Sequence, residues 1–258
     1  FFEGLGLSFG RHQNAVTRFD RTGYTISPPN TQPDTLRAGL TFLSDVASNL
    51  ILPEDGIEQE RAIILEERRA SLSPQQRVLY ELIERIAPGS RFGQRIPIGT
   101  EEVLTTAGRE PIERYYDTWY VPSNMTLLVV GDVTPDDVTG TIEELFGAGE
   151  YVPRPEGVDA NVTPTEGRRA IVASDPEETR EEVAINFIDV PGEPTTTVGQ
   201  YRRDLVMSLG TSMMSDRLSE GVQDGDLSML GGSASTGDFA GAIRWTQVTG
   251  RSENGRWR

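Results

Sequence analysis

Two glutamates, Glu60 and Glu67, fall on what the sequence predicts to be the apolar side of a helix over residues 57–69. At 100° per residue they share one stripe with four apolar residues, which are Ile57, Ile63, Ile64 and Ala70. A carboxylate buried without a partner is costly, so such a residue is normally paired, protonated or bound to a metal. This helix is therefore the strongest candidate for a functional site.

The seven-residue spacing limits what the two carboxylates can do together. Their Cα atoms stand about 10 Å apart along the helix axis, and helical side chains lean in one direction, so the carboxylates do not converge. One metal ion would take one of them, and the other could orient a ligand. Because buried acids are most often paired, spacing alone favours ion pairs with arginines over a metal site. The opposite side is predicted to be a solvated face of charges: Glu58, Glu66, Arg61, Arg68 and Arg69.

The composition excludes several classes of catalyst. The chain has 24 basic residues, all arginine, which excludes a lysine nucleophile or Schiff base. It has no cysteine, which excludes thiol catalysis, thiolate metal sites and disulfides. His12 is the single histidine and lies in a polar turn before a predicted strand, so we interpret it as a surface residue.

The charge balance bears on partners. A formal charge of −16 argues against non-specific binding to nucleic acid or to an anionic membrane, because both need a basic surface. It would favour cationic partners, although solubility alone is the more ordinary explanation. No apolar run approaches the ~18 residues typical of a membrane helix. We therefore expect neither a nucleic acid nor a membrane as partner.

The elements that would position the glutamates follow from apolar periodicity and turn residues. Helices are expected from Asp34, over 57–69, after Ser73-Pro74, over about 110–119, after Thr134-Pro135 and from about 195 to 220. Strands are expected at 14–19, 23–26, 125–130, 170–173 and 183–187. The final forty residues fit either strands of an incomplete sheet or a flexible end. Both ends of the chain are expected to fall inside domains.

Several short blocks follow one another in an order typical of a known family. The first are Gly10-x-x-x-Asn14-Ala15-x-Thr17 and Glu58-x-Glu60-Arg61-x-Ile63-Ile64-x-Glu66-Glu67. The next are Phe92-Gly93-x-x-Ile96-Pro97-Ile98-Gly99-Thr100, Tyr120-x-Pro122-x-Asn124-Met125 and Leu145-Phe146-Gly147. Together they resemble the N-terminal domain of the insulinase/pitrilysin (M16) zinc peptidases. Met213-Met214-Ser215-Asp216-Arg217-Leu218 gives a looser match to the second domain of that family.

The resemblance implies an α+β fold of LuxS/M16 metallopeptidase-like domains, each a mainly antiparallel sheet with helices packed on one face. It divides the chain into an N-terminally incomplete zinc-type domain (1–147), a linker (148–167) and the start of a second domain (168–258). It also implies a clamshell around a peptide chamber, closed by a second M16-like half from the same chain or from a partner subunit.

The resemblance also implies roles for individual residues. Glu67 corresponds to the family's distal zinc-binding glutamate, and Glu60 to an accessory acid that supports the metal site. The strand Asn14, Ala15, Val16 and Thr17 corresponds to the edge that holds an extended peptide substrate by β-augmentation. Zinc in this family also needs two histidines of a His-x-x-Glu-His motif, whose glutamate is the general base. That motif does not occur in this sequence.

Two functions remain open. In the first, the motif lies upstream of Phe1, and the parent protein is a zinc-dependent metalloendopeptidase that hydrolyses peptides. The chain alone would then be inactive and would bind zinc weakly or not at all. In the alternative, the protein is a non-catalytic M16-like subunit that binds peptides or serves assembly.

Overall fold

The computed structural model describes residues 7, 12–147, 151–163, 167–189, 195–253 and 255. Contacts divide the chain into two compact units. Unit 1 comprises Phe1–Arg69 and Pro97–Val158, and unit 2 comprises Ala70–Ile96 and Asp159–Arg258. Gly10, which opens the first family-like block, lies outside the described residues. The predicted boundaries at 147 and 168 stay a prediction.

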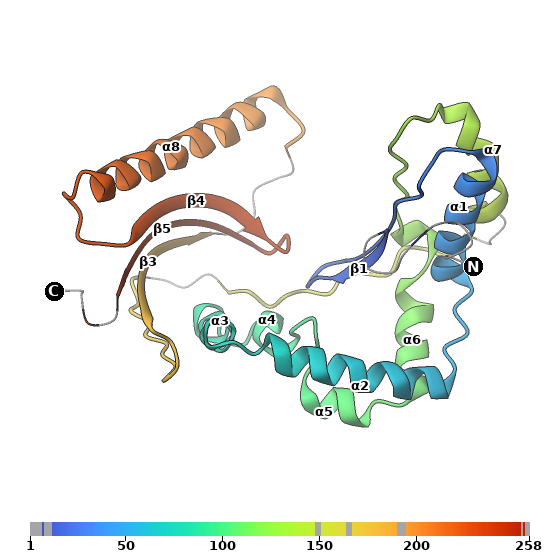
Figure 1. Ribbon diagram of the computed structural model, residues 1–258, viewed down its shortest axis with the longest axis horizontal. Coiled ribbons are helices and arrows are strands. Elements are labelled where there is room, and N and C mark those ends of the chain that lie inside the picture. Colours follow the sequence, from blue (N-terminus) through green and yellow to red (C-terminus); the bar gives the residue numbers. More distant parts are fainter. Residues whose placement is uncertain are drawn as a thin grey trace. The chain divides into compact units, whose positions relative to one another are not determined.

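Unit 1 is a hairpin with helices (Figure 1). Its elements are β1 (Gln13–Thr17), β2 (Thr22–Ile26), α1 (Pro33–Ser48), α2 (Glu54–Ser71, whose last residues count with unit 2), α5 (Glu101–Thr106), α6 (Arg109–Trp119), the 3-10 turn η2 (Pro122–Asn124) and α7 (Pro135–Phe146). The helices α1 and α7 lie against each other. Leu40 and Val46 of α1 and Val138 of α7 are buried.

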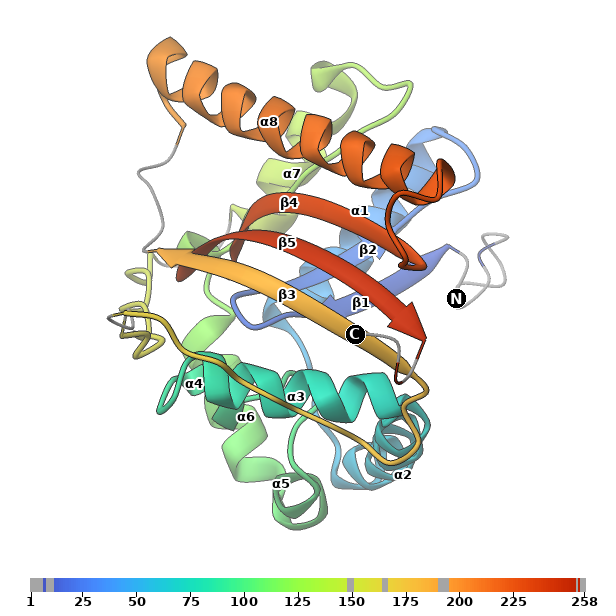
Figure 2. The same cartoon turned by 90° about the vertical axis from the view of Figure 1, so that its left-hand side faces the viewer.

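Unit 2 is a three-stranded antiparallel sheet with a long helix on it. Its elements are α3 (Pro74–Ile86), α4 (Arg91–Gln94), β3 (Arg180–Asp189), α8 (Val198–Gln223), β4 (Gly231–Phe239) and β5 (Ile243–Glu253). The strand order is β3-β5-β4. Figure 2 shows α8 running across β4, with β5 and then β3 farther away. The approach is close at Gly232, where an added Cβ would lie 3.1 Å from Leu218 Cβ.

An extended segment, residues 167–174, follows α3 without joining a sheet. The end of this segment is fixed by Arg77 of α3. The Arg77 guanidinium donates to both carboxylate oxygens of Asp175, at 2.6 Å to Oδ2 and 2.8 Å to Oδ1. It also donates to Glu177 Oε2 at 2.5 Å. The same guanidinium donates to the Leu72 carbonyl at 2.8 Å. Hydrogen bonds from Arg77 and from the Glu177 backbone N–H lower the pKa of Asp175 to about 2.

The predicted fold class is confirmed: the described chain mixes helices with antiparallel sheets. The predicted helices and the strands near 14–19, 23–26 and 183–187 are present. Within the final forty residues, which the sequence left open, Gly231–Phe239 forms β4 and Ile243–Glu253 forms β5.

Two predicted strands are absent from the described structure. Residues 125–130 and 170–173 form no ladder with any described residue. Both have the apolar character of a strand, but a strand also needs a neighbour, and neither finds one in the described part of the chain. Leu128 and Val130 are consequently 80% and 95% exposed.

Candidate functional site

The helix α2 turns a different side inward than its sequence pattern predicts. Glu60 and Glu67 are both exposed, and Ile63 between them is 60% exposed. No residue of α2 is fully buried. The predicted burial is therefore wrong for Glu60, Ile63, Glu67 and Ala70, whereas Ile57 and Ile64 are half-buried as predicted. The half-buried side of α2 consists of Ile57, Arg61, Ile64, Leu65 and Arg68.

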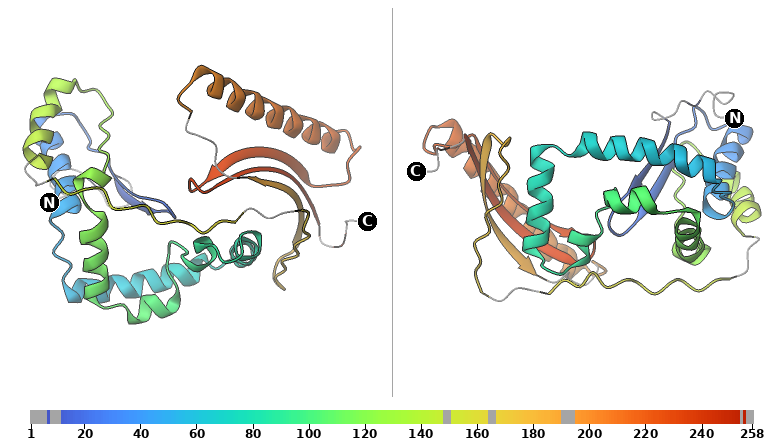
Figure 3. Two further views of the ribbon diagram at one scale, coloured as in Figure 1. Left: turned by 180° about the vertical axis from the view of Figure 1, so that it is seen from behind. Right: turned by 90° about the horizontal axis from the view of Figure 1, so that it is seen from below.

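Arg61 explains the difference. Its side chain is only 16% exposed, and its guanidinium donates to the carbonyls of Leu104 and Ala107 at the end of α5. The guanidinium also pairs with Glu58: Arg61 Nη2 donates to Oε1 at 2.8 Å, and Arg61 Nε donates to Oε2 at 2.9 Å. The last carbonyls of a helix have no partner within the helix and attract a cation. Figures 1 and 3 show α5 beside α2, where this contact forms. Arg61 is thus an anchor rather than the solvated charge predicted.

The glutamates of α2 fall into two kinds. Glu58 pairs with Arg61, and Glu66 pairs with Arg69 at 2.5 Å, as predicted for the charged side. Hydrogen bonding to Arg61 lowers the pKa of Glu58. Glu60 and Glu67 make no ion pair with any described residue, so the arginine pairing favoured by spacing alone is not found in that part of the chain.

An exposed carboxylate such as that of Glu67 can serve as one ligand of a zinc ion. Zinc sites in proteins use three or four ligands from His, Cys, Asp and Glu. No group of three such residues is gathered for a metal anywhere in the described ranges. A zinc ion at Glu67 would need its remaining ligands from outside the described residues.

The predicted peptide-binding strand is exposed, and its register shows which backbone groups are available. The Ser27 N–H donates to the His12 carbonyl at 2.7 Å, and the Arg18 N–H to the Arg21 carbonyl at 2.8 Å. Hydrogen-bonded pairs alternate along an antiparallel ladder, so Asn14 and Val16 turn their backbone groups toward β2. The groups on the outer edge belong to the three residues between, which are Gln13, Ala15 and Thr17.

The outer N–H of Ala15 already has a local acceptor. It donates to Asn14 Oδ1 at 2.9 Å. An incoming peptide carbonyl would have to replace this contact. At this edge Asn14 presents its side-chain amide and Ala15 its backbone N–H.

A tyrosine cluster braces the hairpin from α6, and sequence reasoning missed this role. Tyr24 of β2 and Tyr120 share a hydrogen bond of 2.6 Å between their hydroxyls. Tyr120 lies against Tyr116, with ring centroids 4.6 Å apart, and Tyr116 donates to the Val46 carbonyl at 3.0 Å. Burial, followed by the bond with Tyr24, raises the pKa of Tyr120. The Tyr120-x-Pro122-x-Asn124 block drew attention to Tyr120 in the sequence, but it did not indicate that Tyr24 is the partner of Tyr120.

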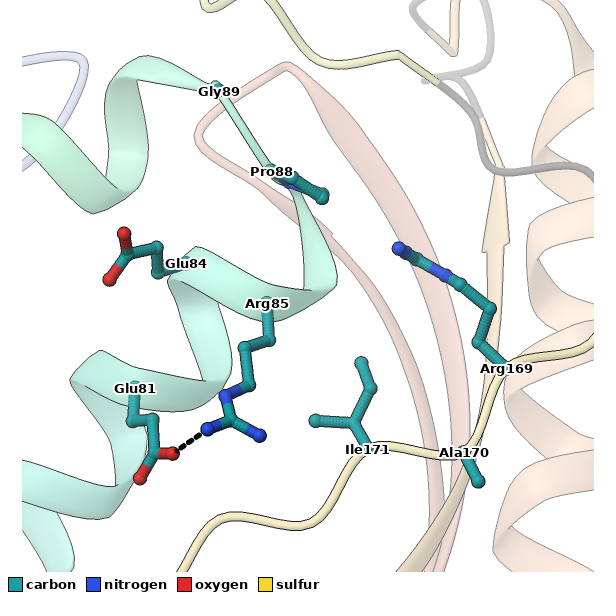
Figure 4. Close-up of a pocket in the computed structure, with 8 residues that line it drawn as sticks. All are labelled: Glu81, Glu84, Arg85, Pro88, Gly89, Arg169, Ala170 and Ile171. Carbon is teal, nitrogen blue, oxygen red and sulfur yellow. Dashed lines mark ion pairs between the residues drawn. The ribbon is translucent and has the colours of Figure 1, made fainter.

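Unit 2 has a shallow open groove of about 790 Å³ between α3 and the extended segment (Figure 4). Its charged groups balance one another. Arg85 pairs with Glu81 at 2.5 Å and donates to the Val172 carbonyl, and Arg169 donates to the Ile86 carbonyl. None of the predicted site residues lines it.

Comparison with known proteins bears on the family. The family described as Peptidase M16 inactive domain matches residues 106–222. The "Probable zinc protease PqqL" of Haemophilus influenzae is 27% identical over 221 residues, 84% of this chain and 24% of that protein. The Escherichia coli protein of the same name is 26% identical over 90% of this chain and 25% of its own length. These matches support the interpretation of this chain as a fragment of an M16 family protein.

Solved structures share the fold of this chain. The periplasmic protease PqqL from Escherichia coli superposes with a TM-score of 0.88 at 24% identity, over 98% of this chain and 28% of that one. A mutant of the ferredoxin protease FusC, in complex with Arabidopsis ferredoxin, gives a TM-score of 0.76 at 27% identity. The superposition covers 97% of this chain and 28% of that one. The M16 chain spans about a quarter of the length of the relatives it matches first.

Among the described residues, every helix is too short or too polar to span a lipid bilayer.

Proposed function

We propose that this M16 chain is part of a longer zinc-dependent endopeptidase, called the parent protein below, and that Glu67 is one of its zinc ligands. The observation that carries the proposal is the pair of relatives named zinc protease, which align with 84% and 90% of the chain. The exposed Glu60 and Glu67, unpaired within the described chain, are consistent with it. A structural acid on this helix would be expected to pair, as Glu58 and Glu66 do.

Each part of the site has a separate task in this proposal. When bound, zinc would supply a metal-activated water for attack on a peptide carbonyl. Glu67 would hold the ion, and Glu60, seven residues earlier, would orient a ligand. Arg61 fixes the rotation of α2 and so keeps both carboxylates outward. β1 would hold the substrate as an added strand.

The metal assignment is tested by Glu67→Gln in the parent protein, with Glu66→Gln as the matched control. Both changes remove one carboxylate from adjacent positions of α2. We expect Glu67→Gln to lower bound zinc and peptidase activity by at least about tenfold, and Glu66→Gln to leave both near wild type. Equal zinc content in the two variants, measured by metal analysis, would refute the role of Glu67.

The peptide edge is tested by Ala15→Pro, because the Ala15 N–H points away from β2 and proline is tolerated at such edge positions. The hairpin should persist while the outer donor is lost. We expect peptide binding, measured by fluorescence anisotropy with an inactive parent variant, to weaken about tenfold or more. Ala15→Val keeps the N–H and should bind normally. Unchanged affinity of Ala15→Pro would count against β1 as the binding edge.

A second candidate is a non-catalytic M16 subunit that binds peptides or serves assembly. It is favoured by the matched family's own description as an inactive domain. The two candidates differ in the parent protein: the first requires stoichiometric zinc and peptide cleavage, and the second requires peptide binding with neither. Under both, the isolated chain should hold no stoichiometric zinc.

A further inference from the structure

The peptide edge proposed for β1 depends on its pairing with one tyrosine of β2. Ala15, which carries the outer N–H, is directly opposite Tyr24. The ladder hydrogen bonds fall on the residues on either side of this pair, so Ala15 and Tyr24 share none. In such a pair the Cα atoms are only about 4.5 Å apart, and the two side chains lie on one face of the hairpin. Any displacement of Tyr24 therefore displaces Ala15.

The hairpin needs support from outside its own ladder. Among the described residues, β1 and β2 form a sheet of two strands, and a two-stranded hairpin alone is at best marginally stable in water. Ile26, on the same face as Tyr24, lies near α1: a Cβ added to Gly39 would be 3.8 Å from Ile26 Cγ2. Because Ile26 is opposite Gln13, this contact supports the start of β1. The middle of β1, at Ala15, is left to Tyr24.

Tyr24 is held in place by a hydrogen bond and not only by packing. Its hydroxyl lies 2.6 Å from that of Tyr120, and the two rings meet edge to face with centroids 6.3 Å apart. Tyr120 follows the last residue of α6 and is half-buried. Because a hydrogen bond is directional, this hydroxyl pair sets the orientation of the Tyr24 ring as well as its distance from α6.

The same tyrosine cluster reaches the segment that leads into α2. The ring centroid of Tyr116 is 4.6 Å from that of Tyr120. The Tyr116 hydroxyl donates to the Val46 carbonyl at 3.0 Å and accepts from the Leu50 N–H at 3.3 Å. Leu50 precedes α2 by four residues. Within unit 1, the peptide edge and the segment before the helix of Glu67 are thus tied to one set of aromatic rings.

We propose that Tyr24 and Tyr120 are positioning residues for the peptide substrate, and that their hydroxyl pair holds the outer edge of β1 in the place where an extended peptide is bound. The inference rests on the proposed function, because it requires β1 to be the peptide edge. Both tyrosines act through Ala15 and not by contact with the peptide. The packing of α1 against α7 does not involve the pair, so unit 1 should stay folded without it.

The hydroxyl pair is tested by Tyr24→Phe and Tyr120→Phe in the parent protein, alone and together. The matched control is Tyr115→Phe, on the same helix and 55% exposed. Binding of fluorescein-labelled casein, an unfolded polypeptide, is measured by anisotropy with a chelator present, so that no cleavage occurs. We expect each single variant to weaken binding about three- to tenfold, and Tyr115→Phe to bind like wild type.

The double variant shows whether the two tyrosines act as one unit. Because each single variant removes the same hydrogen bond, the double variant should bind no more weakly than either single. Additive effects, or wild-type affinity in both single variants, would overturn the proposal.

A destabilised variant remote from the hairpin separates positioning from folding. Val138→Ala leaves a cavity where α7 packs on α1, so it should lower the Tm by several degrees. Its affinity for casein below the melt should equal that of wild type, whereas Tyr24→Phe should change the affinity more and the Tm less. Affinity that falls in step with the Tm in both variants would show a general structural role and overturn the proposal.

Ala15→Pro, measured with the same probe, distinguishes this inference from the proposed function. If Ala15→Pro binds casein normally, β1 is not the peptide edge, and both fail. If Ala15→Pro weakens binding and the tyrosine variants do not, the peptide edge stands and only the positioning role of Tyr24 and Tyr120 is lost.

Discussion

At the residue scale, the decisive contact of α2 is made by an arginine and not by the glutamates that drew attention to the helix. Glu60 and Glu67 are outward because Arg61 is inward, bonded to Glu58 and to two carbonyls of the α5 terminus. An arginine suits this position because its planar guanidinium has several fixed donors, whereas the lysine ammonium is a point charge.

Replacing Arg61 tests that explanation. Arg61→Met keeps much of the stem but removes every donor, so the Leu104 and Ala107 carbonyls lose a buried partner. We expect the Tm of the chain, measured by circular dichroism, to fall by several degrees. Arg69→Met, which removes a partner of Glu66 at the exposed end of the helix, should change it little. Equal effects of the two variants would show that Arg61 is an ordinary surface charge.

At the element scale, the extended segment 167–174 has no ladder within the described chain and depends on side chains of α3. The main fixed point is Arg77 with Asp175, whose side chain is 11% exposed. Asp175 also accepts from the Glu177 N–H at 3.0 Å, so its carboxylate form is stabilised twice. An ionised acid therefore holds the end of the segment, and hydrogen bonds from Arg85 to the Val172 carbonyl and from Arg169 to the Ile86 carbonyl hold the rest.

The pH dependence of that contact follows from the sign of the pKa shift. The pKa of Asp175 is about 2 in the folded chain, below the ordinary value of 3.8. The stabilising effect is therefore complete above the ordinary pKa and is lost as the pH falls from about 4 towards 2. Thermal melts of wild type and Asp175→Asn should differ most at pH 6 and converge near pH 2. A difference that stays constant over this range would contradict the assignment.

At the scale of the whole molecule, charge limits the partners. The chain carries −16 with a pI near 4.5. We predict no binding to duplex DNA or to phosphatidylserine vesicles at pH 7 and 150 mM salt, because both are anionic. Electrophoretic mobility shift and vesicle co-sedimentation measure this directly. Saturable binding in either assay would show a basic patch that the net charge conceals.

The sequence alone was sufficient for most of the helices, for three of the strands and for the resemblance to the M16 family. Periodicity and caps predicted the helices: the Ser73 hydroxyl accepts from the Gln76 N–H, and Thr134 with Asp137 forms a capping box. Such caps can be predicted because they are formed by residues only a few positions apart in the sequence. The strands at 125–130 and 170–173 could not be predicted reliably, because a strand depends on a neighbour elsewhere in the chain.

The tertiary structure decided which side of each element is buried. The stripe through Glu60, Ile63 and Glu67 is the more apolar one by pattern, but the carbonyls at the end of α5 attract Arg61, and the helix turns accordingly. The outer edge of β1 likewise depends on its pairing with β2, since a shift of one residue would exchange Ala15 with Val16. Periodicity fixes which residues share a face, and only long-range contacts fix where that face points.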